Sequence, residues 1–341
     1  MRITLTDIAR EAGVSTATVD RVLNNRSGVR NRTHHRVMAA AERLGYIEQA
    51  PVRSHHPADP AEAVQLDFVL PGGTNSFIAN LNHQISQMAA LRDDVTLRIH
   101  MVDGFNPDVL ARTLEAIRPT TLGVALVGLD HPTVREAIRA LAAADIPVVT
   151  LISDIRHVPR IGYIGIDNRA AGRLAGYLLG RFLKRGTGKV ALFAGSLSYR
   201  GHEEREMGFR NILQEEYPDL AIVELREVRD DIDRAYTEAK ALLGRHPDLA
   251  GIYNIGGGNR GIARALEEAG RAESTIFIGH ELTEHTRRFL VAGAMDAVID
   301  QNPRVEAREA IDRLARAARG EALPDTPSIR VQAIFRENMP D

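Results

Sequence analysis

The sequence predicts an α/β protein with a small helical head and a larger body of two lobes. From residue 64 onward, short apolar runs alternate with amphipathic stretches, which is the pattern of repeated β-α units and of parallel sheets. More than nine such runs fall within about 270 residues, which indicates two sheets rather than one. Before residue 48, the apolar side chains instead recur at helical spacing.

The composition is that of an ordinary globular protein. The chain has 341 residues, of which 44% are hydrophobic and 26% are charged. It contains no cysteine, which excludes disulfides, thiolate nucleophiles and cysteine zinc sites. The first residues, MRITLTDIAREAG, lack the apolar core of a signal peptide, and no run is long enough to span a membrane. A cytoplasmic location without a membrane partner is therefore expected.

The charge is unevenly distributed along the chain. Residues 1–50 carry eight Arg and five Asp or Glu, a net charge of +3, whereas the remaining residues carry −5. A basic head on an acidic body indicates a polyanionic partner for the head alone.

Three short helices are predicted in the head. Thr4 and Asp7 fit a capping box for the first helix, and Gly13 is placed to end it. Ser15 can cap a second helix at 16–24, and a third runs over 32–44. The expected apolar seam between them consists of Ile8, Ala9, Val14, Val19, Val22, Leu23, Val37, Ala40, Ala41 and Leu44. The tight first turn is typical of a helix-turn-helix, although the apolar spacing alone also fits other small helical bundles.

The exposed face of the second helix favours DNA binding. Thr16, Ala17 and Arg21 lie where a helix inserted into the major groove presents side chains to the bases. Arg21 can donate two hydrogen bonds to a guanine, and the short Thr16 and Ala17 can contact a thymine methyl. Phosphate contacts at the rim are expected from Arg2, Arg30, Arg32, Thr33 and Arg36.

Residues 3–47 read ITLTDIAREAGVSTATVDRVLNNRSGVRNRTHHRVMAAAERLGYI. This segment resembles the head of the lactose-repressor (LacI/GalR) family of transcriptional regulators. The resemblance implies a DNA-binding domain at 1–47, with Thr16, Ala17 and Arg21 at the base-reading positions. Asp20 stands where the family usually has serine, which places an acid near the phosphates or a cytosine amino group. The expected DNA-binding residues are Thr4, Ser15, Thr16, Ala17, Thr18, Asp20, Arg21, Asn24, Arg30, Thr33 and Tyr46.

Residues 48–63 are expected to form an atypical linker. The family has a hinge helix here, whose leucine enters the minor groove and kinks the DNA. In this chain three prolines oppose a continuous helix, and no leucine occurs between Leu44 and Leu66. The sequence therefore predicts a weaker bend in the operator than the family's leucine wedge produces.

The body is predicted to contain ten strands with helices between them. The candidate strands are 65–70, 96–102, 123–128, 147–152, 163–166, 189–194, 222–227, 251–255, 276–279 and 296–300. Amphipathic helices are expected at 107–117, 132–144, 169–185 and 235–243.

Polar side chains follow nearly every predicted strand. Ligands of open α/β sheets bind outside the carboxyl ends of the strands, so these side chains are candidates for bonding hydroxyl groups, with Phe or Tyr against a sugar ring. The candidates are Asn75, Phe77, Asp103, Asp130, Ser153, Asp154, Tyr199, Asn254, Asn259, Glu281 and Gln301. Asp and Asn also favour turns and caps, which leaves each of them a purely structural alternative. The acids Asp230, Asp231 and Asp233 are expected to form a solvated loop.

The body resembles the core of the LacI/GalR family and its relatives, the periplasmic sugar-binding proteins, over most of 64–335. The likeness lies in YIGIDNRAAGRLAGYLLGRFL, GSLSYRGHEEREMGFRNIL, GIYNIGGGNRGIARALEEAG and IGHELTEHTRRFLVAGAMDAVIDQNP. It implies one lobe at about 64–167 and 296–324, and a second at about 168–295 and 325–335. It also implies an effector site between the lobes that includes Arg205, Glu281 and Gln301.

Head and body together indicate a homodimeric repressor whose affinity for operator DNA is controlled by a small effector. The expected effector is a monosaccharide, a polyol or a sugar derivative. We expect no cofactor, no metal and no catalytic activity. The alternative is an NAD(P)-binding oxidoreductase or dinucleotide sensor, because residues 256–261 read GGGNRG after a predicted strand and Glu281 follows about 20 residues later.

Overall fold

The computed structural model describes residues 4–23, 63–183, 187–325 and 329–340, together with residues 29, 33, 36, 37, 40, 41 and 44. The chain divides into two compact units, Met1–His56 and Pro57–Asp341, here called the head and the body. None of the described helices is long and apolar enough to cross a membrane. Most of the predicted linker, 48–63, lies outside the described residues.

The head begins with two helices whose ends are set by local hydrogen bonds. Helix α1 (Leu5–Ala12) starts at Thr4, whose backbone N–H donates to the Asp7 carboxylate at 3.0 Å, and ends at Gly13 with φ of 61°. Helix α2 (Thr16–Leu23) follows directly, and Ser15 Oγ accepts a hydrogen bond from the Thr18 N–H at 3.2 Å. The predicted caps are therefore confirmed.

A small apolar core holds the head together. Ile8 of α1 and Val19 of α2 are fully buried, as are the described Val37, Ala40 and Ala41 of the predicted third helix. The other positions of that helix, 32–44, lie largely outside the described residues.

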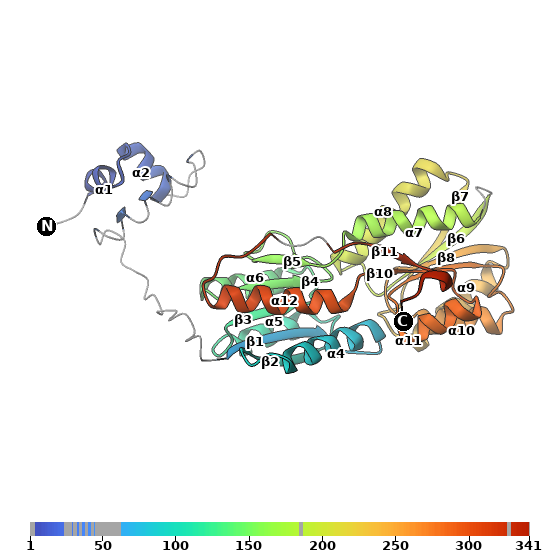
Figure 1. Cartoon of the computed structure of the whole chain (residues 1–341). Helices are drawn as coiled ribbons and strands as arrows, with labels where there is room; N and C mark the ends of the chain where they lie inside the picture. The colour runs from blue at the N-terminus through green and yellow to red at the C-terminus, as the bar shows by residue number, and fades with distance from the viewer. Residues whose placement is uncertain are drawn as a thin grey trace. The chain divides into compact units, whose positions relative to one another are not determined.

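The body contains two sheets (Figure 1). The first sheet has the order β2-β1-β3-β4-β5 and is parallel throughout. Its strands are β1 (Val64–Pro71), β2 (Val95–Val102), β3 (Gly123–Leu126), β4 (Val148–Leu151) and β5 (Gly162–Ile164).

The second sheet has the order β11-β10-β9-β8-β6-β7, with only the edge strand β11 antiparallel to its neighbour. Its strands are β6 (Gly188–Ala194), β7 (Leu220–Glu227), β8 (Leu249–Asn254), β9 (Ile276–His280), β10 (Ala297–Asp300) and β11 (Gln332–Ile334).

Helices cover both faces of each sheet, so the central strands are buried on both sides and read as continuous apolar runs. The first sheet lies between α4 (Ser76–Ala90) with α12 (Pro303–Ala318) and α5 (Pro107–Ile117) with α6 (Pro132–Ala143). The second lies between α7 (Asn168–Phe182) with α8 (Arg200–Glu216) and a group of three, α9 (Ile232–Arg245), α10 (Asn259–Glu268) and α11 (Glu284–Ala292). A short 3₁₀ turn, Arg336–Asn338, follows β11.

The chain crosses between the lobes at points that differ in part from the prediction. The predicted return to the first lobe at residue 296 is wrong, because β10 pairs with β9 and β11 in the second sheet. The return comes after β10, and α12 then packs on the first lobe. All ten predicted strands are present, but β11 was not predicted, because three residues at a sheet edge carry too little pattern.

Two glycines allow α7 and α8 to cross closely. A Cβ at Gly208 would lie 2.1 Å from the backbone oxygen of Arg169, and a Cβ at Gly172 would lie 1.9 Å from that of Arg205. The obstructing atoms are backbone, so side-chain rotation cannot relieve either contact.

Gly208→Ala is therefore expected to lower the free energy of unfolding by about 1–3 kcal/mol through overpacking. Denaturant unfolding measures the change. The matched control is Gly244→Ala in α9, where a Cβ meets nothing within 4 Å, and which should be neutral or stabilising by up to about 1 kcal/mol. Equal stability of the two variants would contradict the close crossing.

Candidate functional site

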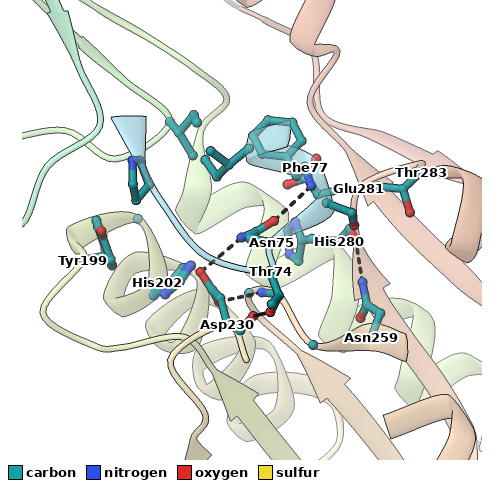
Figure 2. Close-up of a pocket in the computed structure, with 18 of the residues that line it drawn as sticks. Thr74, Asn75, Phe77, Tyr199, His202, Asp230, Asn259, His280, Glu281 and Thr283 are labelled. Atoms are coloured by element: carbon teal, nitrogen blue, oxygen red, sulfur yellow. Dashed lines mark hydrogen bonds between the residues drawn. The ribbon is translucent and has the colours of Figure 1, made fainter. Parts of the chain in front are cut away.

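A cleft lies between the two lobes, where carboxyl ends of strands from both sheets meet. Eight of the predicted effector residues line it, namely Asn75, Phe77, Ser153, Tyr199, Arg205, Asn259, Glu281 and Gln301. Figure 2 labels Asn75, Phe77, Tyr199, Asn259 and Glu281 among them. They lie in the loops that follow strands of both sheets, or in the helices into which these loops lead, as the rule for open α/β sheets predicts.

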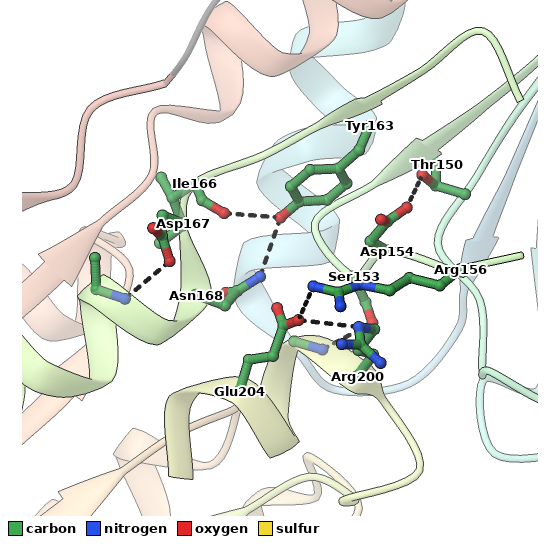
Figure 3. Close-up of polar contacts among 12 residues, drawn as sticks. Thr150, Ser153, Asp154, Arg156, Tyr163, Ile166, Asp167, Asn168, Arg200 and Glu204 are labelled. Carbon is green, nitrogen blue, oxygen red and sulfur yellow. Dashed lines mark hydrogen bonds and ion pairs between the residues drawn. The ribbon is translucent and has the colours of Figure 1, made fainter. Parts of the chain in front are cut away.

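Four predicted effector residues do not line the cleft. Asp103 caps the next turn by accepting a hydrogen bond from the Phe105 N–H at 3.1 Å. Asp130 pairs with Arg135 at 2.6 Å, and Asp154 pairs with Arg160 and accepts from Thr150 at 2.8 Å (Figure 3). Asn254 is buried behind the glycine loop, where it donates to Asn259 at 2.7 Å. These four residues have the structural roles that the sequence left open.

Arg205 lies at the floor of the cleft with 3% of its surface exposed. Its Nε donates to Asn168 Oδ1 at 2.7 Å, its Nη1 to the Ile255 carbonyl at 2.9 Å, and its Nη2 to Gln301 Oε1 at 3.4 Å. These acceptors are neutral, so the bonds hold the guanidinium in place without cancelling its charge.

Glu281 is the buried acid beside this guanidinium. Burial raises the pKa of the Glu281 carboxyl to about 8, although Arg205 opposes the rise. Gln301 donates to one carboxylate oxygen, and Oε2 has no hydrogen-bond partner among the described residues. Burial likewise raises the pKa of Glu306 well above its ordinary value. At neutral pH the protonated form of Glu281 is therefore favoured, and burial shifts Glu306 in the same direction.

Two histidines in the cleft are kept neutral by burial. Burial lowers the pKa of His280 well below its ordinary value, and it also lowers the pKa of His202, against the charge of Asp230. His280 Nε2 is 2.7 Å from the Tyr253 hydroxyl, while its Nδ1 has no partner among the described residues. Both imidazoles can thus exchange hydrogen bonds with an uncharged ligand.

Asp230 joins the two walls of the cleft. Its Oδ2 accepts from Asn75 Nδ2 of the first lobe at 3.1 Å, and its Oδ1 accepts from the Gly257 N–H at 2.7 Å (Figure 2). Thr74 Oγ1 also donates to its backbone carbonyl at 3.1 Å. The expectation of a solvated loop is wrong for Asp230, because left-handed backbone at Arg229 and Asp230 turns this side chain into the cleft.

The glycine loop at 256–258 packs against Asp230. A Cβ at Gly256 would lie 2.6 Å from Asp230 Oδ1, and a Cβ at Gly257 would lie 2.8 Å from Asp230 Cβ. The space that a pyrophosphate needs in a dinucleotide site is thus taken by a carboxylate, and the Gly257 N–H already donates to it. The glycines therefore serve packing, and this geometry disfavours the dinucleotide alternative.

In the head, the predicted base-reading residues lie on the surface. Thr16, Ala17 and Arg21 of α2 are exposed. Arg36, expected at a phosphate, donates instead to the Ala12 carbonyl at the end of α1. Of the other residues predicted to contact DNA, the structure describes Thr4, Ser15, Thr18, Asp20 and Thr33. Asn24, Arg30 and Tyr46 lie outside the described residues.

Two known families match the chain. Residues 4–49 match the family described as bacterial regulatory proteins, lacI family. Residues 66–322 match the family described as periplasmic binding protein domain. The resemblances seen in the sequence are thereby confirmed.

Relatives of this chain include both regulators and binding proteins. The ribose operon repressor of Halalkalibacterium halodurans is 24% identical over 250 residues, which cover 73% of this chain and 70% of the repressor. The regulator DegA of Bacillus subtilis is 23% identical over 254 residues, which cover 73% of this chain and 72% of DegA.

Solved structures share the fold of the body. A solute-binding protein of Burkholderia graminis in complex with D-arabinose matches with a TM-score of 0.76 and 23% identity, over 82% of this chain and 98% of that protein. A glucose-galactose binding protein of Geobacillus stearothermophilus matches with a TM-score of 0.73 and 25% identity, over 82% and 99%. The predicted α/β fold class is confirmed.

The raised pKa of Glu281 predicts a pH-dependent stability. Between its ordinary pKa of 4.5 and about 8, the folded state keeps a proton that the unfolded state has lost. The free energy of unfolding should therefore fall as pH rises through this window, by up to about 1.4 kcal/mol per pH unit. Glu281→Gln should remove this loss, so the variant gains stability relative to the parent between pH 5 and pH 8.

Chemical denaturation at both pH values measures that difference. The matched control is Glu284→Gln, an exposed residue of α11, which should follow the parent at both pH values. Parallel pH profiles of Glu281→Gln and the parent would contradict the assignment.

Proposed function

This chain belongs to the lacI family of bacterial regulatory proteins and has a periplasmic-binding-protein body, and from this we propose that it represses transcription under the control of a sugar-like effector. The observation that carries the proposal is the presence, in one chain, of a helix that exposes Thr16, Ala17 and Arg21 and of a cleft between two lobes that is lined by polar side chains of the second lobe.

The head supplies the DNA-binding surface. Arg21, Thr16 and Ala17 lie exposed on α2, where an inserted helix meets base edges. Only side chains that lie outside the core of the head can contact the bases, and these three side chains lie outside it. We assign base reading to them and phosphate contacts to residues around them.

The cleft supplies the effector site. Neutral imidazoles and a protonated carboxyl suit an uncharged ligand rich in hydroxyl groups, and Phe77 offers an aromatic surface. The relatives named for ribose regulation and for D-arabinose or glucose-galactose binding support a sugar or polyol.

A homodimer is the assembly that this function requires. One weakly basic head binds DNA poorly, whereas two linked heads on a near-palindromic operator gain from effective concentration. Effector bound between the lobes favours one lobe arrangement and so changes the operator affinity, with a typical coupling of about 1–3 kcal/mol. Since its target is genomic DNA, we place the protein in the cytoplasm.

A thermal-shift screen tests the effector class. The purified protein is heated with sugars, polyols, sugar acids, sugar phosphates and nicotinamide dinucleotides. A ligand at a hundred times its Kd stabilises the folded state by about 2.7 kcal/mol, so a hit among sugars or polyols is expected. Stabilisation by a dinucleotide alone would contradict the proposal and restore the alternative of a dinucleotide enzyme or sensor.

Substitution of Arg21 tests the base-reading assignment. After operator selection from random DNA, Arg21→Ala should weaken operator binding by about 1–3 kcal/mol and relax the preference at one base pair. Arg10→Ala serves as the control, because Arg10 is an exposed arginine of α1 outside the base-reading surface. Uniform loss by Arg21→Ala on every sequence would contradict its role.

A further inference from the structure

The two walls of the cleft differ in chemistry. All charged and imidazole side chains that line it come from the second lobe, among them Arg205, Asp230, Arg260 and Glu281. The wall from the first lobe, here called the apolar wall, consists chiefly of Pro71, Phe77, Ile78, Val127 and Ile152.

The polar side chains beside the apolar wall are largely engaged by the protein itself. Asn75 accepts from the Phe77 N–H at 3.0 Å and donates to Asp230 at 3.1 Å. Ser153 Oγ accepts from the Gly201 N–H at 3.1 Å (Figure 3), and Thr74 donates to the Asp230 carbonyl. Ser76 adds one exposed hydroxyl. A ligand hydroxyl that faces this wall would lose its water bonds with little replacement.

Ile152 is held on the apolar wall in a strained conformation. Its φ is 64°, a region that β-branched residues avoid. The backbone is fixed there because its N–H donates to the Ile164 carbonyl at 3.0 Å, while its carbonyl accepts from Tyr163 at 2.9 Å and Asn168 at 3.0 Å. Backbone strain of this kind persists only where several hydrogen bonds hold it, and it is found mainly at functional sites. Its presence in the cleft therefore indicates that the Ile152 side chain has a functional role.

The opposite wall has polar atoms without partners. Glu281 Oε2 and His280 Nδ1 are buried and have no hydrogen bond to any described residue. Such atoms need a partner that the protein does not supply, and the cleft brings a ligand to them.

We propose that the effector is amphipathic: a sugar-like part binds Glu281 and His280, and an aryl or alkyl substituent packs on the apolar wall against Ile152. This inference rests on the proposed function and narrows its ligand to substituted sugars such as glycosides. Hydrophobic pockets discriminate single methylene groups by about 10- to 200-fold, so the substituent is expected to dominate selectivity.

The test compares matched ligands by calorimetry on the full chain. The panel contains five- and six-carbon monosaccharides, each as the free sugar, the methyl glycoside and the phenyl glycoside. For at least one sugar, the phenyl glycoside is expected to bind at least about tenfold more tightly than the free sugar. In Ile152→Asn this ratio should fall close to one, and the variant should fold because Asn tolerates left-handed backbone.

Val291→Ser, at an exposed residue of α11 outside the cleft, is the control and should keep the parent's ratio. Free sugars that bind as tightly as their glycosides would overturn the inference and leave the proposed function standing. An unchanged ratio in Ile152→Asn would likewise overturn the inference. Failure of every sugar, polyol and glycoside to bind would overturn the proposed function itself.

Discussion

The buried guanidinium of Arg205 constrains the arrangement of both lobes. A charge with 3% exposure needs hydrogen-bond partners within the protein, and the acceptors of Arg205 come from three separate segments. Asn168 begins α7 after the first crossover, Gln301 begins the second crossover after β10, and Ile255 follows β8. Displacement of either crossover would remove a hydrogen bond from this buried charge. The same bonds set the position of Gln301 beside Glu281, so the effector cleft and the junction of the lobes depend on one network.

Backbone strain gathers where the cleft is built. Among the non-glycine residues described with positive φ, Ile152, Asp230 and Glu281 all line the cleft, and Arg229 adjoins it. The backbone of each is held by a hydrogen bond from another segment, as the Asp230 carbonyl is by Thr74. The fold thus tolerates locally unfavourable backbone in order to direct particular side chains into the space between the lobes.

The sequence predicted the fold more completely than it predicted the site. The apolar runs predicted ten strands correctly, because a strand that is buried on both faces has a strongly apolar sequence. The capping residues of the head predicted where its first helices begin and end. Asp130 and Asp154 pair with arginines five and six residues further along the chain, and residue type alone does not reveal whether an acid after a strand turns toward such an arginine or toward the cleft. Asp230 was missed because left-handed backbone, rather than its residue type, brings it into the cleft. The family resemblance predicted that Arg205, Glu281 and Gln301 belong to one site, and hydrogen bonds link these three side chains through Gln301.

We propose that a ligand bound between the lobes changes the affinity of the head for operator DNA. Titration of operator DNA at zero and saturating effector, and of effector with and without operator, measures the coupling from both sides. Thermodynamic linkage requires the two ratios of affinities to be equal, and we predict a common factor of about 5 to 150. An operator affinity that is unchanged by a saturating effector would contradict it.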